Sequence, residues 1–191
     1  MKIHSVKFNF IMNFIMAASS IVFPLITFPY VSRVLMAAGN GKVATASAVI
    51  TYFNMFASLG IPTYGIRACA KVRDDRDKLS QTVQELLIIN SVTMLITCAA
   101  FVFTVALVPE FAAEKELYVI NGIGMVLNMF AITWLYNALE QYAYITVCNL
   151  LVKLVSLVLM LLMVKSPDDY ILYGGITVFA SSASYVFNFV Y

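Results

Sequence analysis

The sequence predicts an all-α membrane protein that crosses the bilayer several times. Hydrophobic residues make up 62% and charged residues 12% of the chain, and the mean hydropathy is +0.89. The chain contains six long runs with almost no charged residues. Each run reaches the roughly 20 residues that a helix needs to cross about 30 Å of hydrocarbon. They are continuous rather than alternating, which argues against a transmembrane β-barrel. The six predicted helices cover approximately residues 8–34, 43–65, 83–108, 117–139, 143–164 and 168–191.

The first span follows Lys2 and Lys7 and resembles the start of a secretory leader. Apolar sequence continues to Val34, however, so we interpret the segment as an uncleaved span. Pro24 and Pro29 are predicted to interrupt this helix, because proline removes a backbone hydrogen bond.

Local signals mark the ends of the later spans. Gly60–Pro62 is predicted to break the second helix near its inner end. Thr82 followed by Glu85 has the spacing of a capping box that opens the third helix, and Pro109 closes that helix. Ser166 precedes a proline and two acids and is predicted to cap the sixth helix. An aromatic belt at one membrane interface is predicted from Trp134, Tyr136, Tyr142 and Tyr144.

The distribution of basic residues predicts a cytoplasmic N-terminus, because cytoplasmic segments carry an excess of Lys and Arg. The N-terminal side of the predicted topology holds Lys2, Lys7, Arg67, Lys71, Arg73, Arg76 and Lys78. The opposite side holds only Arg33, Lys42, Lys115 and Lys165.

Several function classes find no support in the sequence. A net charge of +2 without a basic cluster does not favour nucleic acid. A single histidine, His4, and three cysteines without CxxC spacing predict no metal site and no cofactor. Gly39–Lys42 lacks the remaining residues of a phosphate-binding loop, and no catalytic triad is possible, so no enzyme is predicted.

Small polar residues recur at helical spacing within the spans. The second span carries them at Ser47, Thr51, Asn54 and Ser58, and the sixth at Thr177, Ser181, Ser184 and Asn188. Such stripes either join helices through hydrogen bonds or surround a polar cavity, and both interpretations stay open.

One of the six runs, the fifth, contains a charged residue near its middle. This residue is Lys153. A charge at that depth costs about 2.5–3.5 kcal/mol and usually faces an interior or a pathway. Thr146, Asn149 and Ser156 share its helix face. The spans offer no carboxylate, so we expect the counter-charge from a part of the protein beyond Tyr191 or from an anionic ligand.

Three blocks, in this order and spacing, resemble bacterial Wzx-type oligosaccharide flippases of the MATE-like MOP superfamily. They are Phe23–Leu35, then Leu59–Arg67 with Ala70–Asp75, and then Trp134–Tyr136, Glu140, Tyr144–Thr146, Lys153 and Lys165–Tyr170. The resemblance implies two pseudo-symmetric lobes around a cationic cavity, of which residues 1–191 would form the N-terminal lobe while the C-terminal lobe is missing. Two departures are Ala37–Asn40 in place of a glycine-proline turn and Thr133 where an acid is common.

The same resemblance implies transfer of undecaprenyl-diphosphate-linked repeat units across the bacterial inner membrane by alternating access, for O-antigen, capsule or exopolysaccharide. The expected partners are this anionic lipid, membrane lipids and the polysaccharide polymerase and ligase machinery. Lys153 would be the mid-depth cation, with Arg33 and Arg67 near opposite mouths. Pro24, Pro29 and Pro62 are candidates for gating positions.

Two alternatives remain. A multidrug or cation antiporter of the same superfamily generally needs an intramembrane Asp or Glu, which these spans lack. A non-transporting scaffold in polysaccharide assembly would have no reason to tolerate a central lysine.

Overall fold

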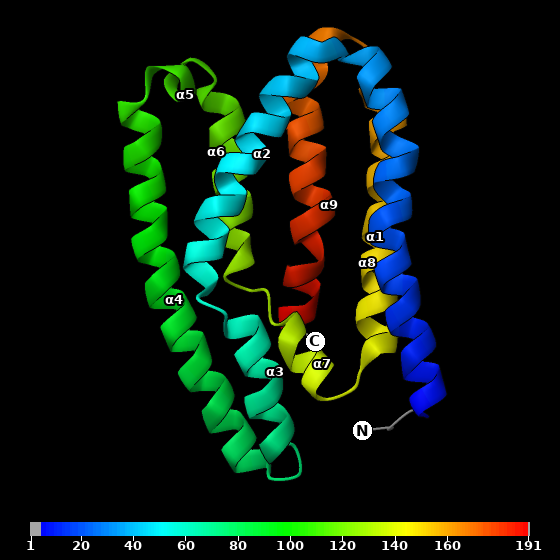
Figure 1. The fold of residues 1–191 in the computed structure, drawn as a ribbon, viewed down its shortest axis with the longest axis vertical. Helices are drawn as coiled ribbons and strands as arrows, with labels where there is room; N and C mark the ends of the chain where they lie inside the picture. Colours follow the sequence, from blue (N-terminus) through cyan, green and yellow to red (C-terminus); the bar gives the residue numbers. More distant parts are fainter. Residues whose placement is uncertain (1–4, 191) are drawn as a thin grey trace.

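The computed structural model describes residues 5–190, and in this range the chain is a bundle of α-helices without strands (Figure 1). Lys2, His4 and Tyr191 lie outside the described residues. Six segments are long and apolar enough to cross a membrane, which confirms the predicted all-α, multi-pass class. The helices are α1 (Val6–Val34), α2 (Met36–Ser58), α3 (Ile61–Val72), α4 (Arg76–Leu107), α5 (Pro109–Ala113), α6 (Lys115–Asn128), α7 (Thr133–Ala138), α8 (Tyr142–Met163) and α9 (Tyr170–Val190).

The helices form two groups that α9 joins. α1 packs along α8, while α2 packs against α4 and α6. α9 contacts both α6 and α8 and therefore lies between the groups (Figure 1). α1 begins and α9 ends in the half of the bundle that contains the α3–α4 connection (Figure 1).

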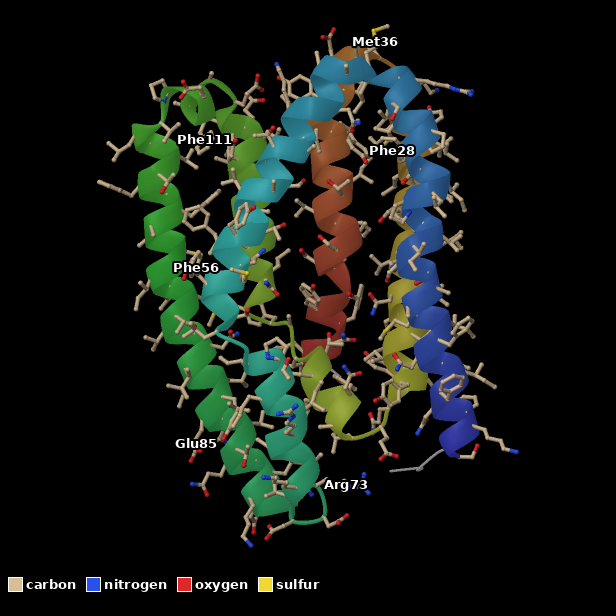
Figure 2. The ribbon with its side chains drawn as sticks, in the orientation of Figure 1. Phe28, Met36, Phe56, Arg73, Glu85 and Phe111 are labelled. Carbon is tan, nitrogen blue, oxygen red and sulfur yellow. The ribbon has the colours of Figure 1, made fainter. Side chains whose placement is uncertain are left out.

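Large apolar side chains cover the outside of the bundle. Phe28 and Phe56, both labelled in Figure 2, are 60% and 64% exposed. In water this surface would be strongly unfavourable, whereas hydrocarbon accepts it without cost. The exposed phenylalanines are therefore a direct sign of the lipid environment.

The second predicted span consists of two helices, α2 and α3. Leu59 and Gly60 connect them in left-handed backbone conformations, with φ of 42° and 75°. Pro62 lies in the first turn of α3, where its missing N–H costs no intrahelical hydrogen bond. The fourth predicted span is also divided, because α6 ends at Asn128 and α7 begins at Thr133.

The predicted start of the third span at Thr82 is wrong. α4 begins at Arg76, and Asp75 is its N-cap, since the Asp75 carboxylate accepts the Lys78 backbone N–H at 3.2 Å. Thr82 lies within the helix and donates its hydroxyl to the Lys78 carbonyl. The Thr82–Glu85 spacing thus has the pattern of a capping box but lies inside the helix, because Asp75 caps the helix further upstream.

The prolines of the first span do not interrupt it. α1 is continuous from Val6 to Val34 with Pro24 and Pro29 inside it. Membrane helices tolerate the loss of single backbone hydrogen bonds at proline because local adjustments compensate for them. The predicted signals at Pro109 and Ser166 do match the structure: α4 ends before Pro109, and Asp169 accepts the Ser166 N–H at 2.7 Å.

Two of the aromatic residues predicted to form an interfacial belt are buried. Trp134 and Tyr136 of α7 are 5% and 7% exposed and lie in an apolar core with α3. Gly65 of α3 permits this packing, because a Cβ atom there would lie 2.6 Å from Trp134 Cε3. The indole ring thus occupies the space that a side chain at residue 65 would need.

This contact predicts a stability difference between two glycine variants. Gly65→Ala forces the indole or α3 to shift, and we expect a loss of about 1–3 kcal/mol, typical of overpacking. Gly41→Ala is the control, because a Cβ atom at Gly41 of α2 meets nothing within 4 Å. Thermal unfolding in detergent should show a lower Tm for Gly65→Ala and no loss for Gly41→Ala. Equal Tm values would contradict the close Gly65–Trp134 contact.

An ionic contact joins α2, the α5–α6 connection and α9 at the end of the bundle away from the N-terminus. Lys42 forms an ion pair with Glu114, and the Tyr170 hydroxyl donates to the second Glu114 oxygen at 2.8 Å. The Lys42 amine also lies 4.6 Å from the centre of the Tyr170 ring. The hydrogen bond from Lys42 lowers the pKa of the Glu114 carboxyl below its usual value.

The lowered pKa gives this contact a defined pH dependence. Its contribution to folding is fully present above the ordinary carboxyl pKa and is lost as the pH falls through the lower folded-state pKa. Glu114→Gln should therefore reduce Tm slightly at pH 7, and its difference from wild type should vanish in acid. Glu110→Gln changes an exposed glutamate of α5 and serves as the control. A Tm difference for Glu114→Gln that persists unchanged in acid would contradict the ion pair.

Candidate functional site

Lys153 lies at the centre of α8, eleven residues from Tyr142 and ten from Met163. At 1.5 Å per residue, its Cα is roughly 15 Å from either end of the helix. The side chain is half-buried and turns toward α1 rather than toward a helix end. Its Nζ donates to Ser19 Oγ at 3.0 Å and to Ser20 Oγ at 3.1 Å.

The charge of Lys153 is not balanced by a carboxylate among residues 5–190. The ion pairs in this range are Lys42–Glu114, Arg73–Glu140 and Lys78–Asp75. Serine hydroxyls supply partial negative charge and accept two of the three ammonium protons, which leaves one donor. The Ser20 side of the contact lies at the exposed surface of the described bundle.

The polar neighbours of Lys153 on α8 hold the helix in place. Thr146 donates to the Met12 carbonyl of α1 at 3.1 Å, and Asn149 accepts a 3.5 Å hydrogen bond from Ser184 of α9. Ser156 is fully buried and donates to the Val152 carbonyl. The three residues therefore join α8 to its neighbours or satisfy its backbone, and Lys153 alone presents a charge.

The two arginines that were predicted as substrate-binding candidates lie far from Lys153. Arg33 is exposed in the last turn of α1, thirteen residues or roughly 20 Å beyond Ser20. Arg67 is exposed on α3, at the opposite end of the bundle (Figure 1). The structure therefore does not bring the three cations together.

A polar cavity of about 320 Å³ lies between α2, α6 and α9. None of its lining residues is charged. The sequence stripes contained the polar lining residues of α2 and, on α9, Thr177 and Ser181. They missed Ser182 and Tyr185 of α9, and Asn121 and Asn128 of α6, whose spacing of seven places them on one face. The polar lining residues are Ser47, Thr51, Asn54, Asn121, Asn128, Thr177, Ser181, Ser182 and Tyr185.

Both interpretations of the polar stripes apply, in part at the same residues. Asn128 donates to Asn54 at 3.1 Å and so links α6 to α2, while the same two residues line the cavity. Ser184 and Asn188 of α9 lie outside the cavity and are buried at 1% and 0% exposure. The Asn188 carbonyl accepts the Tyr136 hydroxyl at 2.7 Å, which ties α9 to α7.

A second polar pocket, of about 270 Å³, lies at the N-terminal end of the bundle. Asn9 and Asn13 of α1 line it together with Glu140, which has a left-handed φ of 57°. Glu140 accepts a 2.8 Å bond from Arg73, so the α3–α4 and α7–α8 connections are joined there. No cluster of three potential metal ligands occurs within the described range.

Six spans, an uncharged cavity and a central lysine define a multi-pass membrane protein with a polar interior. A family model described as polysaccharide biosynthesis protein matches residues 6–191, and the chain belongs to that family. Two relatives carry the name "Putative O-antigen transporter". The one from Escherichia coli K12 is 25% identical over 172 residues and the one from Shigella dysenteriae 24% over 165 residues.

These matches cover 90% and 86% of this chain but 41% of each relative, so the chain spans about two fifths of their length. No solved structure matches the chain.

Proposed function

We propose that the protein transfers lipid-linked oligosaccharide repeat units across the bacterial inner membrane by alternating access. The product would serve O-antigen, capsule or exopolysaccharide synthesis, and undecaprenyl diphosphate would be the lipid carrier. The observation that carries the proposal is the Lys153 ammonium, held at mid-depth by two serine hydroxyls without a carboxylate among residues 5–190.

Electrostatics favours an anionic passenger at this position. A cation at the centre of a span costs about 2.5–3.5 kcal/mol, which two hydroxyl contacts offset only in part. A diphosphate would accept the remaining ammonium proton and supply the counter-charge, and charge-assisted bonds of this kind are about twice as strong as neutral ones. A lysine that is incompletely satisfied before the substrate arrives can release it again on the other side of the membrane.

The names of the relatives support the same direction, because both describe transport of O-antigen. Membrane lipids surround the protein, and polysaccharide polymerase and ligase machinery are its proposed partners in assembly. The role is transport rather than catalysis.

The other predicted residues take roles at a distance from Lys153. Arg33 and Arg67, at opposite ends of the bundle, would attract the anionic lipid at the two mouths. The Leu59–Gly60 break with Pro62 divides the second span and provides a position where α3 can turn relative to α2. Pro24 and Pro29 weaken the backbone bonding of α1 beside Ser20 and would allow it to bend as access alternates.

The alternatives explain Lys153 less well. A cation antiporter would place an acid where this chain has a lysine, and Glu85 lies near the Arg73 end of the bundle (Figure 2). A scaffold would gain nothing from a cation at mid-depth.

Lys153 substitutions test the proposal. Lys153→Ala should lower export of labelled repeat units at least tenfold in a flippase-deficient strain, because charge-assisted hydrogen bonds of about 1.5–3 kcal/mol are lost. Lys153→Arg keeps the charge but changes its geometry and should retain part of the activity. Lys165→Ala removes an exposed lysine at the end of α8 and should export normally. Normal export by Lys153→Ala at wild-type protein level would refute the assigned role.

The proposed orientation has its own test. At the Arg73–Asp75 turn, a reporter that is active only in the cytoplasm should give a signal. At Glu110, a reporter that is active only in the periplasm should give a signal. These turns lie at opposite ends of the bundle (Figure 1), so the two reporters should give opposite locations. The reverse pattern would show that the N-terminus lies outside the cytoplasm.

A further inference from the structure

We infer that the uncharged cavity between α2, α6 and α9 binds the neutral sugar units of the transported lipid, separately from its diphosphate. This inference rests on the proposed function, since it assigns a second part of the same substrate. Lys153 would then bind the charged part of the lipid, and the cavity would bind its neutral part.

The lining of the cavity matches a neutral polyol. Amide and hydroxyl side chains both donate and accept hydrogen bonds, as sugar hydroxyls do. The lining has no charge, so a diphosphate or a cationic drug would lose its hydration there without gaining a counter-charge. A sugar meets no such penalty.

Hydrogen bonds already present leave the cavity with both donors and acceptors. Thr51 donates to the Ser47 carbonyl at 2.7 Å, and Ser181 to the Thr177 carbonyl at 3.0 Å, so their oxygen lone pairs remain as acceptors. The bond between Asn128 Nδ2 and Asn54 Oδ1 leaves the Asn54 amide as a donor and the Asn128 carbonyl oxygen as an acceptor. A ligand hydroxyl can therefore bond in either sense.

The size of the cavity fits part of an oligosaccharide. Its volume of about 320 Å³ is at the lower end of ligand pockets, which span about 300–1,000 Å³. Along α2 it extends from Ser47 to Asn54, roughly 10 Å at 1.5 Å per residue. This space suits a short run of sugar units and excludes the whole lipid-linked molecule.

Helix packing alone does not explain these polar residues. α6 and α9 approach closely through glycines, since a Cβ atom at Gly124 would lie 2.7 Å from Val178 and one at Gly174 would collide with Leu117. Contacts of this kind need no polar side chain. The hydroxyls and amides instead surround the space that this packing leaves open.

The cavity is connected by α9 to the region of Lys153. Thr177 lines the cavity and also a small pocket that Thr27 of α1 and Ser156 of α8 share. Ser156 lies one helical turn from Lys153. Thr177, Thr27 and Ser156 therefore place polar atoms between the proposed sugar site and the helix that carries Lys153, in a small pocket whose other lining residues are apolar or aromatic.

A pair of threonines provides a matched test. Thr51 and Thr104 make the same bond to the carbonyl four residues earlier, at 2.7 and 2.8 Å, but only Thr51 lines the cavity. The full-length protein in lipid nanodiscs would be titrated with undecaprenyl diphosphate alone and with the same lipid bearing the neutral repeat unit of the expressing strain. Thr51→Val should raise the Kd for the sugar-bearing lipid about 3- to 10-fold, as expected for one neutral hydrogen bond. The Kd for the bare lipid should stay unchanged, and Thr104→Val should change neither value.

A double variant separates binding from structure. Asn54→Leu with Asn128→Leu removes both partners of one hydrogen bond, which a packing role tolerates and a sugar-binding role does not. It should weaken binding of the sugar-bearing lipid more than Thr51→Val does, with the bare lipid again unaffected. Unchanged binding of the sugar-bearing lipid, or equal weakening for both lipids, would overturn the sugar site. Failure of the wild-type protein to bind either lipid would instead overturn the proposed function.

Discussion

A hydrogen-bonding group inside a bilayer has no water to bond, and this constraint governs the whole interior of the protein. Hydroxyls of the spans return to carbonyls of their own helix, as Thr51, Thr97 and Ser156 do. Amides reach across to a neighbouring helix, as between Asn128 and Asn54. Even the charged Lys153 depends on two hydroxyls of α1. The helices are thus arranged so that most polar atoms find a partner within the protein.

Two departures from this rule coincide with the proposed functional regions, while buried side-chain atoms of Asn9, Ser32, Asn137 and Asn188 lack a partner elsewhere. The cavity between α2, α6 and α9 keeps donors and acceptors that the helices do not use, and Lys153 keeps a charge that no described carboxylate neutralises. Either arrangement would cost free energy in a protein whose only task was to pack. In the proposed function, their separation on the two sides of α9 would provide distinct environments for the neutral and anionic parts of one amphiphilic molecule.

Much of the fold follows from the sequence, because crossing hydrocarbon requires long uncharged helices and six such runs are visible. The Ser166 cap and the stop before Pro109 depend on neighbouring residues and were also predictable. The break of the second span, predicted at Gly60–Pro62, is confirmed at Leu59–Gly60, but the left-handed φ of 42° at Leu59 has no local sequence signal. Lys153 could be found as an isolated charge, but its serine partners lie 133 and 134 residues away in sequence. Asn121 and Asn128 gain their importance only from α2 and α9, which pack around them.

Charge is distributed so that strong contacts lie at the ends of the bundle and weak ones at its centre. Lys42–Glu114 joins α2 to α9 through Tyr170 at one end, and Arg73–Glu140 joins two connections at the other. Between them, neutral hydrogen bonds of about 0.6 kcal/mol each hold the helices together. Helices fixed at their ends and loosely bonded at mid-depth can shift around a ligand without separating. In the proposed function this combination would let the protein admit a large lipid-linked sugar and release it again, since a centre joined by ion pairs would have to break them in every cycle.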